Sequence, residues 1–233
     1  MSKVTDSHLS QFGKPLPPSL FADDSRRIVA HVALKRGFDV VGVIAILLIA
    51  SPVMLAIWLL VRLDGGSGLY GHVRIGRGGR SFRCLKFRTM VLNADAVLQA
   101  LLATDAEAAE EWARARKLIR DPRVTWIGRI LRASSLDELP QLLNVLRGEM
   151  SLVGPRPVVR DELDKFYHGE DRVAYLSVRP GLTGLWQVSG RSDASYDQRV
   201  RLDREYVNTA SFGLDMMILL RTVTVVLLQR GAY

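Results

Sequence analysis

The chain has 233 residues, 48% of them hydrophobic and 24% charged, which suits one domain with appendages and is enough to bury a core. The formal net charge of +8 predicts an anionic partner, which leaves nucleic acid, an anionic membrane surface or a phosphorylated substrate. The single cysteine, Cys84, excludes an internal disulfide. Its position predicts a small apolar side chain in a strand.

Residues 1–27 are polar, contain three prolines and show no apolar periodicity. This composition predicts a disordered tail. No apolar core follows the first few residues, so we expect no signal peptide.

The stretch from Val40 to Val61 contains 22 residues without a charge. As a helix it would be about 33 Å long, enough to cross a hydrocarbon core of about 30 Å. Ser51 and Pro52 lie at its centre, where proline removes a helical hydrogen bond and predicts a sharp bend.

Basic residues flank this stretch on both sides, and positive charge marks the cytoplasmic side of a membrane. They are Arg26, Arg27, Lys35 and Arg36 before it and Arg62, Arg74, Arg77, Arg80 and Arg83 after it. A bent helix that enters and leaves by the same leaflet satisfies both the proline and the charges. A straight span remains the main alternative, and a buried helix of a soluble domain is a third.

The segment from Leu69 to Met90 predicts a β-hairpin with its turn at Arg77-Gly78-Gly79. Its basic residues are Arg74, Arg80, Arg83, Lys86 and Arg88. A solvated face near anionic lipid would explain most of them. After the hairpin, residues 94–118 predict one acidic, alanine-rich helix. Asp121 to Thr125 then turn the chain into a short helix that ends near Arg132.

The stretch from Arg132 to Pro157 is central to the chain. Leucines at positions 139, 142, 143 and 146 predict an amphipathic helix that ends at Arg147-Gly148. Asp137 and Glu138 lie at its start, and Arg132 and Arg156 flank them. A helix start and fixed arginines attract phosphate, so the pattern sets a carboxylate beside a phosphate.

A purely structural interpretation of the two acids is also open. Ser135 to Glu138 fits a capping box, in which Ser135 caps the helix and Glu138 bonds back to it. Pro140 favours a slightly later start with Asp137 as the cap. These residues alone do not decide between chemistry and capping.

The remaining chain predicts three helices and one loop. Residues 161–166 and 194–207 are helical in pattern, and a Gly/Pro-rich segment from Val178 to Arg191 carries Trp186 as an anchor. Residues 212–228 are apolar but interrupted by Asp215 and Arg221. This last helix could lie along a membrane interface or pack in the core.

Several of these blocks together resemble the bacterial sugar transferases, the monotopic phosphoglycosyl transferases that start exopolysaccharide and O-antigen synthesis. The blocks are the Ser51-Pro52 hairpin, K-F-R-T-M at 86–90, D-P-R-V-T at 121–125, S-L-D-E-L-P to G-P-R-P at 135–157, R-P-G-L-T-G-L-W-Q-V-S-G-R at 179–191 and L-D-x-x-Y at 202–206. They cover about Lys35 to Tyr233 in the order of the family.

The resemblance implies transfer of a sugar-1-phosphate from a UDP-sugar to undecaprenyl phosphate, with release of UMP. It implies that Asp137 is the nucleophile, which forms a covalent phosphosugar-aspartate, and that Glu138 is its acidic partner, associated with Mg²⁺. It places Arg132, Arg156, Lys86 and Asp203 among the residues that bind phosphate or shape the site. A hexose such as galactose or glucose is the expected sugar.

The expected fold is α+β and mostly helical, with a disordered tail at 1–27, a re-entrant membrane helix at 28–62 and a cytoplasmic catalytic domain at 63–233 that carries a small β-hairpin and interfacial amphipathic helices. The expected location is the cytoplasmic face of the bacterial inner membrane. The expected partners are the UDP-sugar, undecaprenyl phosphate and membrane lipid, not nucleic acid, and association of copies is left open. The alternative is a membrane-tethered protein without catalysis that binds anionic lipid or nucleic acid.

Overall fold

The computed structural model describes residues 18–63, 65–115, 118–189 and 194–227. The chain divides into two compact units, Met1–Phe38 and Asp39–Tyr233. The described part of the first unit is helical, and every other element lies in the second.

The longest element is α1, Pro18–Arg62, which includes residues 18–27 that we assigned to the tail. The rest of that predicted tail, residues 1–17, lies outside the described part of the chain. Residues 33–62 are long and apolar enough to cross a membrane. Many of their apolar side chains are exposed, among them Val41, Leu48, Ile49 and Leu55.

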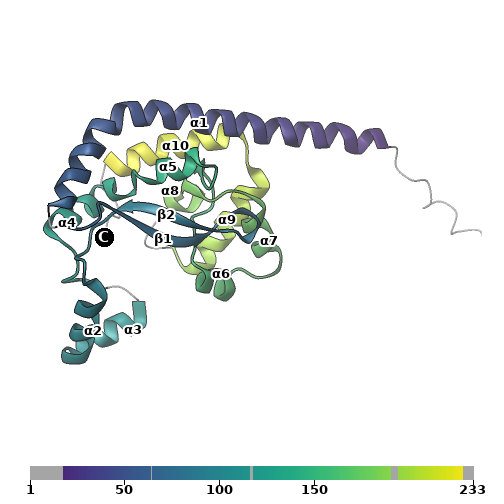
Figure 1. Ribbon diagram of the computed structural model, residues 1–233. Coiled ribbons are helices and arrows are strands. Elements are labelled where there is room, and N and C mark those ends of the chain that lie inside the picture. Colours follow the sequence, from purple (N-terminus) through teal and green to yellow (C-terminus); the bar gives the residue numbers. More distant parts are fainter. Residues whose placement is uncertain (1–17, 64, 116–117, 190–193, 228–233) are drawn as a thin grey trace, which may run out of the picture. The chain divides into compact units, whose positions relative to one another are not determined.

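The chain does not break at Ser51-Pro52. The helix continues through Pro52, and Ser51 Oγ donates to the carbonyl oxygen of Leu48 at 3.3 Å. Figure 1 shows α1 bending within its blue part. We expected two helices separated by a break at this point, and the structure has one bent helix, because a proline disturbs only the hydrogen bonds of its own turn. The re-entrant topology stays a prediction.

The hairpin is confirmed, with β1 (Leu69–Ile75) antiparallel to β2 (Ser81–Phe87). The register runs from Leu69 opposite Phe87 to Ile75 opposite Ser81. The turn η1 (Arg77–Gly79) has positive φ angles of 68° and 77° at its two glycines, a conformation that glycine adopts without strain. Cys84 is buried in β2, as predicted.

The acidic segment after the hairpin forms two helices rather than one. They are α2 (Ala94–Thr104) and α3 (Ala106–Ala115). Asp105 separates them, and its Oδ1 accepts from the amide of Ala108 at 3.0 Å. An aspartate that caps a new helix ends the previous one, which the alanine-rich composition concealed. The predicted short helix is α4 (Trp126–Ala133), capped by Thr125 Oγ1, which accepts from the amide of Gly128 at 3.0 Å.

A parallel strand pair that the sequence did not predict lies near the centre of the second unit. β3 (Ser151–Val153) pairs with β4 (Gly181–Thr183), with residue 151 opposite 181 and residue 153 opposite 183. The connection contains α6 (Arg160–Phe166) and α7 (Gly169–Ser177). The short helix α8 (Leu185–Ser189) follows β4. Residues 190–193 of the predicted Gly/Pro segment lie outside the described residues.

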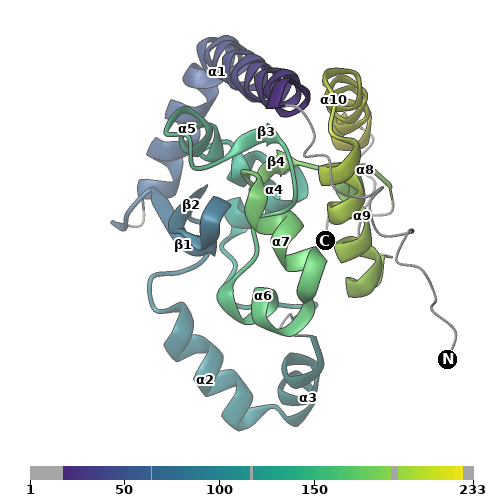
Figure 2. The same ribbon diagram turned by 90° about the vertical axis from the view of Figure 1, so that its right-hand side faces the viewer.

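The last two helices are α9 (Tyr196–Thr209) and α10 (Phe212–Leu227). Figure 2 shows both on one side of β3 and β4, with the hairpin on the other side. In α10, Asp215 and Ile218 are buried, whereas Leu220 is 71% exposed. One face of this helix therefore packs in the core, and the other is open.

Buried contacts fix these elements to one another. Ile57 and Val61 of α1 pack with Phe87 of β2 and Leu131 of α4. A second cluster joins the end of β1 to α6, α7 and α9 through Ile75, Val158, Leu163, Tyr167, Tyr175 and Val200. The buried carboxylate of Asp39 in α1 accepts from Ser151 Oγ at 2.7 Å and from the amide of Leu152 at 3.2 Å. The start of this apolar helix is thus bonded to β3.

Candidate active site

The two acids lie on a short turn rather than at the start of a long helix. Leu136–Glu138 form the 3₁₀ turn η2, and α5 (Gln141–Leu146) begins only after Pro140. Ser135 has a left-handed φ of 57° and makes no capping hydrogen bond with its side chain. The predicted capping box is therefore absent, and the two acids precede a short helix instead of starting a long one. Proline lacks the N–H that would continue a helix from η2 into α5.

Lys86 of β2 brings the two acids together. Its Nζ lies 2.5 Å from Glu138 Oε1 and 3.6 Å from Asp137 Oδ2. The side chain of Asp137 is 11% exposed, and those of Lys86 and Glu138 are 28% exposed. Three predicted site residues from two distant parts of the chain therefore form one cluster that solvent can still reach.

The two carboxyl groups have opposite pKa shifts. Burial raises the pKa of Asp137 above its usual range, although the charges of Lys86 and Arg132 oppose this. Burial acts on Glu138 in the same direction, but Lys86 and Arg156 outweigh it and lower the pKa of that carboxyl. At Asp137, burial thus outweighs the nearby cations. Glu138 therefore carries the more stable negative charge, and Asp137 is the more basic of the two carboxylates.

Asn144 fixes this cluster and was missed in the sequence. It is fully buried in α5, and its Oδ1 accepts from the amide of Leu85 at 2.9 Å. Its Nδ2 donates to the carbonyl of Arg83 at 2.8 Å and to Glu149 Oε2 at 2.6 Å. These bonds attach α5 to β2 beside Lys86. A lone asparagine among the leucines of an apolar helix was the available signal, because buried amides need partners.

Arg156 lies in the loop after β3, between Pro155 and Pro157. It lines one cleft together with Arg74, Lys86, Glu138, Gln141 and Gln187. Its guanidinium lies 5.9 Å from the ring centroid of Trp186 and, within the described residues, makes no ion pair. A half-buried cation without a carboxylate partner is a site for an anion.

Arg132 and Asp203, two further predicted site residues, make other contacts. Arg132 is exposed on α4, where its Nε donates to Thr89 Oγ1 at 2.9 Å. Asp203 is only 2% exposed, and its Oδ2 accepts from the hydroxyl of Tyr167 at 2.7 Å. Burial raises the pKa of Asp203 to about 7, against the effects of Tyr167 and Arg156. Neither residue lines the cleft of Lys86 and Glu138.

The donor set of the cluster suits Mg²⁺. The described residues contain no group of three or more His, Cys, Asp or Glu side chains that could hold a metal ion alone. Two carboxylates nevertheless converge on the single positive charge of Lys86. Mg²⁺ is commonly bound by one or two carboxylates together with substrate phosphates, so Asp137 and Glu138 fit a shared ion.

Comparisons with known proteins identify relatives over most of the chain. Residues 30–229 match the family model described as Bacterial sugar transferase. The chain is 54% identical over 200 residues to the Undecaprenyl-phosphate galactose phosphotransferase of Salmonella typhimurium, which covers 86% of this chain and 42% of that protein. It is also 54% identical over 200 residues to the Exopolysaccharide production protein ExoY of Rhizobium meliloti, over 85% of this chain and 88% of that protein.

A third relative is the UDP-glucose:undecaprenyl-phosphate glucose-1-phosphate transferase of Caulobacter vibrioides, 40% identical over 207 residues, which cover 85% of this chain and 72% of that protein. The chain spans less than half the length of the Salmonella protein and most of the length of the other two. The family model covers all the residues of the cluster. The chain therefore belongs to the bacterial sugar transferase family.

Proposed function

We propose that the protein transfers a hexose-1-phosphate, from UDP-galactose or UDP-glucose, to undecaprenyl phosphate and releases UMP, as a first step in exopolysaccharide or O-antigen synthesis. The names of the relatives support these substrates. The observation that carries the proposal is the half-buried cluster of Asp137, Glu138 and Lys86, of which Glu138 and Lys86 line one cleft with Arg156.

The transfer takes place in two displacements at one phosphorus atom. A carboxylate oxygen of Asp137 attacks the β-phosphorus, the bond from that phosphorus to the oxygen bridging the two phosphates breaks, and UMP leaves with the electron pair. A phosphate oxygen of undecaprenyl phosphate then attacks the phosphorus of the aspartyl phosphosugar. The bond to Asp137 breaks, and the carboxylate is restored. An acyl phosphate is a high-energy intermediate, so both steps are accessible.

The other residues of the cluster hold charge during these steps. Lys86 and Arg156 place positive charge where the phosphates gain negative charge, which lowers the barrier. Glu138, with Asp137, would hold Mg²⁺, which neutralises phosphate charge when bound. The raised pKa of Asp137 makes its ionised oxygen a stronger nucleophile than an ordinary aspartate.

The membrane-facing part of the fold suits a lipid acceptor. Undecaprenyl phosphate is anchored in the bilayer, and the apolar residues 33–62 provide a segment that could be inserted beside it. The net charge of +8 favours binding to the anionic cytoplasmic leaflet, so we place the enzyme on the cytoplasmic face of the inner membrane.

The direct test measures UMP release from a panel of UDP-sugars, with Mg²⁺ and undecaprenyl phosphate. We expect release by the wild type from one hexose donor and a loss of at least about a thousandfold in Asp137→Asn, because an amide cannot form the acyl phosphate. Folded wild-type protein that releases UMP from no donor would favour the non-catalytic alternative.

Magnesium dependence is a separate prediction. Chelation should abolish UMP release, and added Mg²⁺ should restore it. In Glu138→Gln, the Mg²⁺ concentration for half-maximal rate should rise about tenfold, because one carboxylate ligand is lost. Equal Mg²⁺ dependence in wild type and Glu138→Gln would remove Glu138 from the metal site.

A further inference from the structure

A second cleft adjoins the one with the acid pair, and the proposed chemistry leaves it without a use. It is lined by Glu162, Tyr167, Trp186, Tyr196, Arg199 and again Arg156. Arg156 is common to both clefts. A cationic side chain therefore lies where the two clefts meet.

Arg156 is a cation that can serve the diphosphate of the donor, because it lines both clefts. Asp137 must attack the β-phosphorus from the side opposite the leaving oxygen, as in-line displacement requires. The UMP half of the donor then extends away from the acid pair. The second cleft is the adjoining space, since it shares Arg156 with the first.

Aromatic rings and a second arginine form one part of this cleft. Trp186 is 6% exposed, and the guanidinium of Arg199 lies 4.7 Å from its ring centroid. Arg199 is held by its Nε, which donates to the carbonyl of Ala194 at 3.1 Å. Within the described residues its terminal amino groups make no hydrogen bond and remain available as donors. Tyr196 is fixed by stacking on Phe166, with ring centroids 3.7 Å apart.

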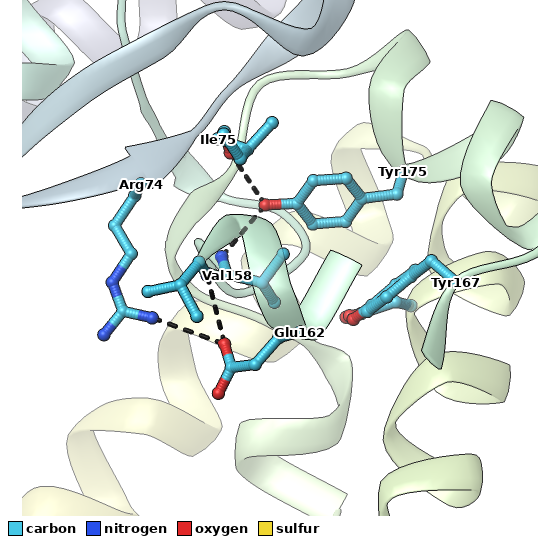
Figure 3. Close-up of polar contacts among 8 residues, drawn as sticks. Arg74, Ile75, Val158, Glu162, Tyr167 and Tyr175 are labelled. Carbon is cyan, nitrogen blue, oxygen red and sulfur yellow. Dashed lines mark hydrogen bonds and ion pairs between the residues drawn. The ribbon is translucent and has the colours of Figure 1, made fainter. Parts of the chain in front are cut away.

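Glu162 supplies an acceptor on the other wall. Its Oε2 accepts from Arg74 Nη1 at 3.4 Å and from the amide of Val159 at 3.1 Å. Figure 3 shows this oxygen engaged, while the other oxygen of the carboxylate points away from both donors. Across the described residues no hydrogen bond reaches Oε1. One oxygen thus holds the carboxylate in place, and the other is free to accept.

Buried hydrogen bonds keep the wall behind Glu162 rigid. The hydroxyl of Tyr175 donates to the carbonyl of Ile75 at 2.9 Å and accepts from the amide of Val158 at 3.1 Å (Figure 3). This joins the hairpin to the loop that follows Arg156. The cleft is therefore preformed, and a ligand loses little free energy in ordering it.

We propose that the second cleft binds the uridine part of the nucleotide-sugar donor. Arg156 binds the diphosphate, Arg199 donates to oxygens of the nucleotide beside the rings of Trp186 and Tyr196, and Glu162 Oε1 accepts from the ribose hydroxyls. Planar rings, guanidinium donors and a fixed acceptor are the groups that a pyrimidine nucleotide requires. The assignment rests on the proposed function for the identity of the donor.

Binding of UMP tests the site without turnover. Calorimetry uses the full chain in lipid nanodiscs, carrying Asp137→Asn so that no reaction occurs. Arg199→Gln should weaken UMP binding about tenfold or more, because charge-assisted hydrogen bonds are lost. The matched control is Arg201→Gln, an exposed arginine of the same helix α9 that lies outside the cleft, which should bind UMP as the parent does.

The ribose contact has its own readout. The parent should bind UMP more tightly than 2′-deoxy-UMP, and Glu162→Gln should reduce that preference severalfold, since a neutral amide is a weaker acceptor. If Glu162 had only a structural role, Glu162→Gln would weaken the binding of UMP and of 2′-deoxy-UMP equally. Thermal unfolding midpoints equal to that of Arg201→Gln would show that the variants are folded.

The outcomes separate the two proposals. UMP binding that depends on Arg199, in a wild type that releases UMP from no donor, would keep the nucleotide site and overturn the reaction. Turnover with UMP affinity unchanged in both Arg199→Gln and Glu162→Gln would overturn the site. A raised KM for the UDP-sugar with unchanged UMP affinity would also overturn it and place the sugar in the cleft.

Discussion

Lys86 affects the pKa of both acids, because its ammonium group lies beside both carboxylates. Its charge lowers the pKa of Asp137 and of Glu138, yet only Glu138 ends below its ordinary value. Burial and the neighbouring charge of Glu138 raise the pKa of Asp137, whereas at Glu138 the charges of the closer Lys86 and of Arg156 outweigh burial. One lysine therefore keeps one acid ionised and leaves the other basic.

Removal of that charge should move the pH dependence of the reaction. Asp137 must be ionised to attack, so UMP release should fall on the acid side as Asp137 gains a proton. In Lys86→Met the midpoint of this acid limb should move to higher pH, because a neighbouring cation no longer favours the carboxylate. The rate at neutral pH should also fall about tenfold or more. Rate profiles between pH 4 and 9 measure both, and an acid limb at unchanged pH would contradict the role of Lys86.

Asp203 should make the protein less stable as pH rises. Its folded pKa of about 7 lies above the 3.8 of an exposed aspartate, so the folded state holds a proton that the unfolded state has released. Stability should therefore fall between about pH 4 and pH 7 and level off above, by on the order of 4 kcal/mol from this group. Asp203→Asn should lose this dependence. Unfolding midpoints across that pH range provide the measurement, and equal slopes in both proteins would refute it.

The residues of the acid cluster could be predicted from the sequence, but the residues around them could not. Asp137 and Glu138 are adjacent in a recognisable block, and Lys86 lies in another such block. Asn144 and Glu162 make contacts with residues far away in the chain. Such pairings have no local pattern, so only the folded chain shows them.

At the scale of elements, the sequence predicted those helices and strands that are stabilised by residues close together in the chain. The hairpin has alternating side chains and a glycine turn, and α4 follows a capping threonine, so both were expected. β3 and β4 are three residues each, without alternation, and become strands only by pairing with each other. Their pairing is a tertiary event, which is why the sequence indicated only a loop there.

Substitution of Gly128 tests how closely α4 approaches the chain that follows the hairpin. A Cβ at this position would clash with the carbonyl oxygen of Thr89, which already accepts from the amide of Thr125. Gly128→Ala should destabilise the protein by about 2 kcal/mol and weaken the contact of Arg132 with Thr89. Gly213→Ala is the control, since nothing lies within 4 Å of its added Cβ. Denaturant unfolding measures the free energy of unfolding of both variants. Equal values for the two would mean that α4 can shift without loss of stability.

At the scale of the whole molecule, one bend and two basic flanks predict a re-entrant topology for residues 33–62. If the segment is re-entrant, engineered cysteines just before Lys35 and just after Arg62 should both resist a membrane-impermeant label added to intact cells. The buried Cys84 provides a low background. Labelling before Lys35 alone would establish a straight span.

The order of the elements also determines when the protein acquires its chemistry. The apolar helix is complete at Arg62, whereas the two clefts need the loop around Arg156, then Gln187 in α8 and Arg199 in α9. Chains are synthesised from the N-terminus, and parallel pairing of β3 with β4 must wait for residue 183. A growing chain therefore offers its apolar helix to the bilayer long before it can hold a nucleotide. For the proposed enzyme, this order makes the apolar helix available to the bilayer before the donor site is complete.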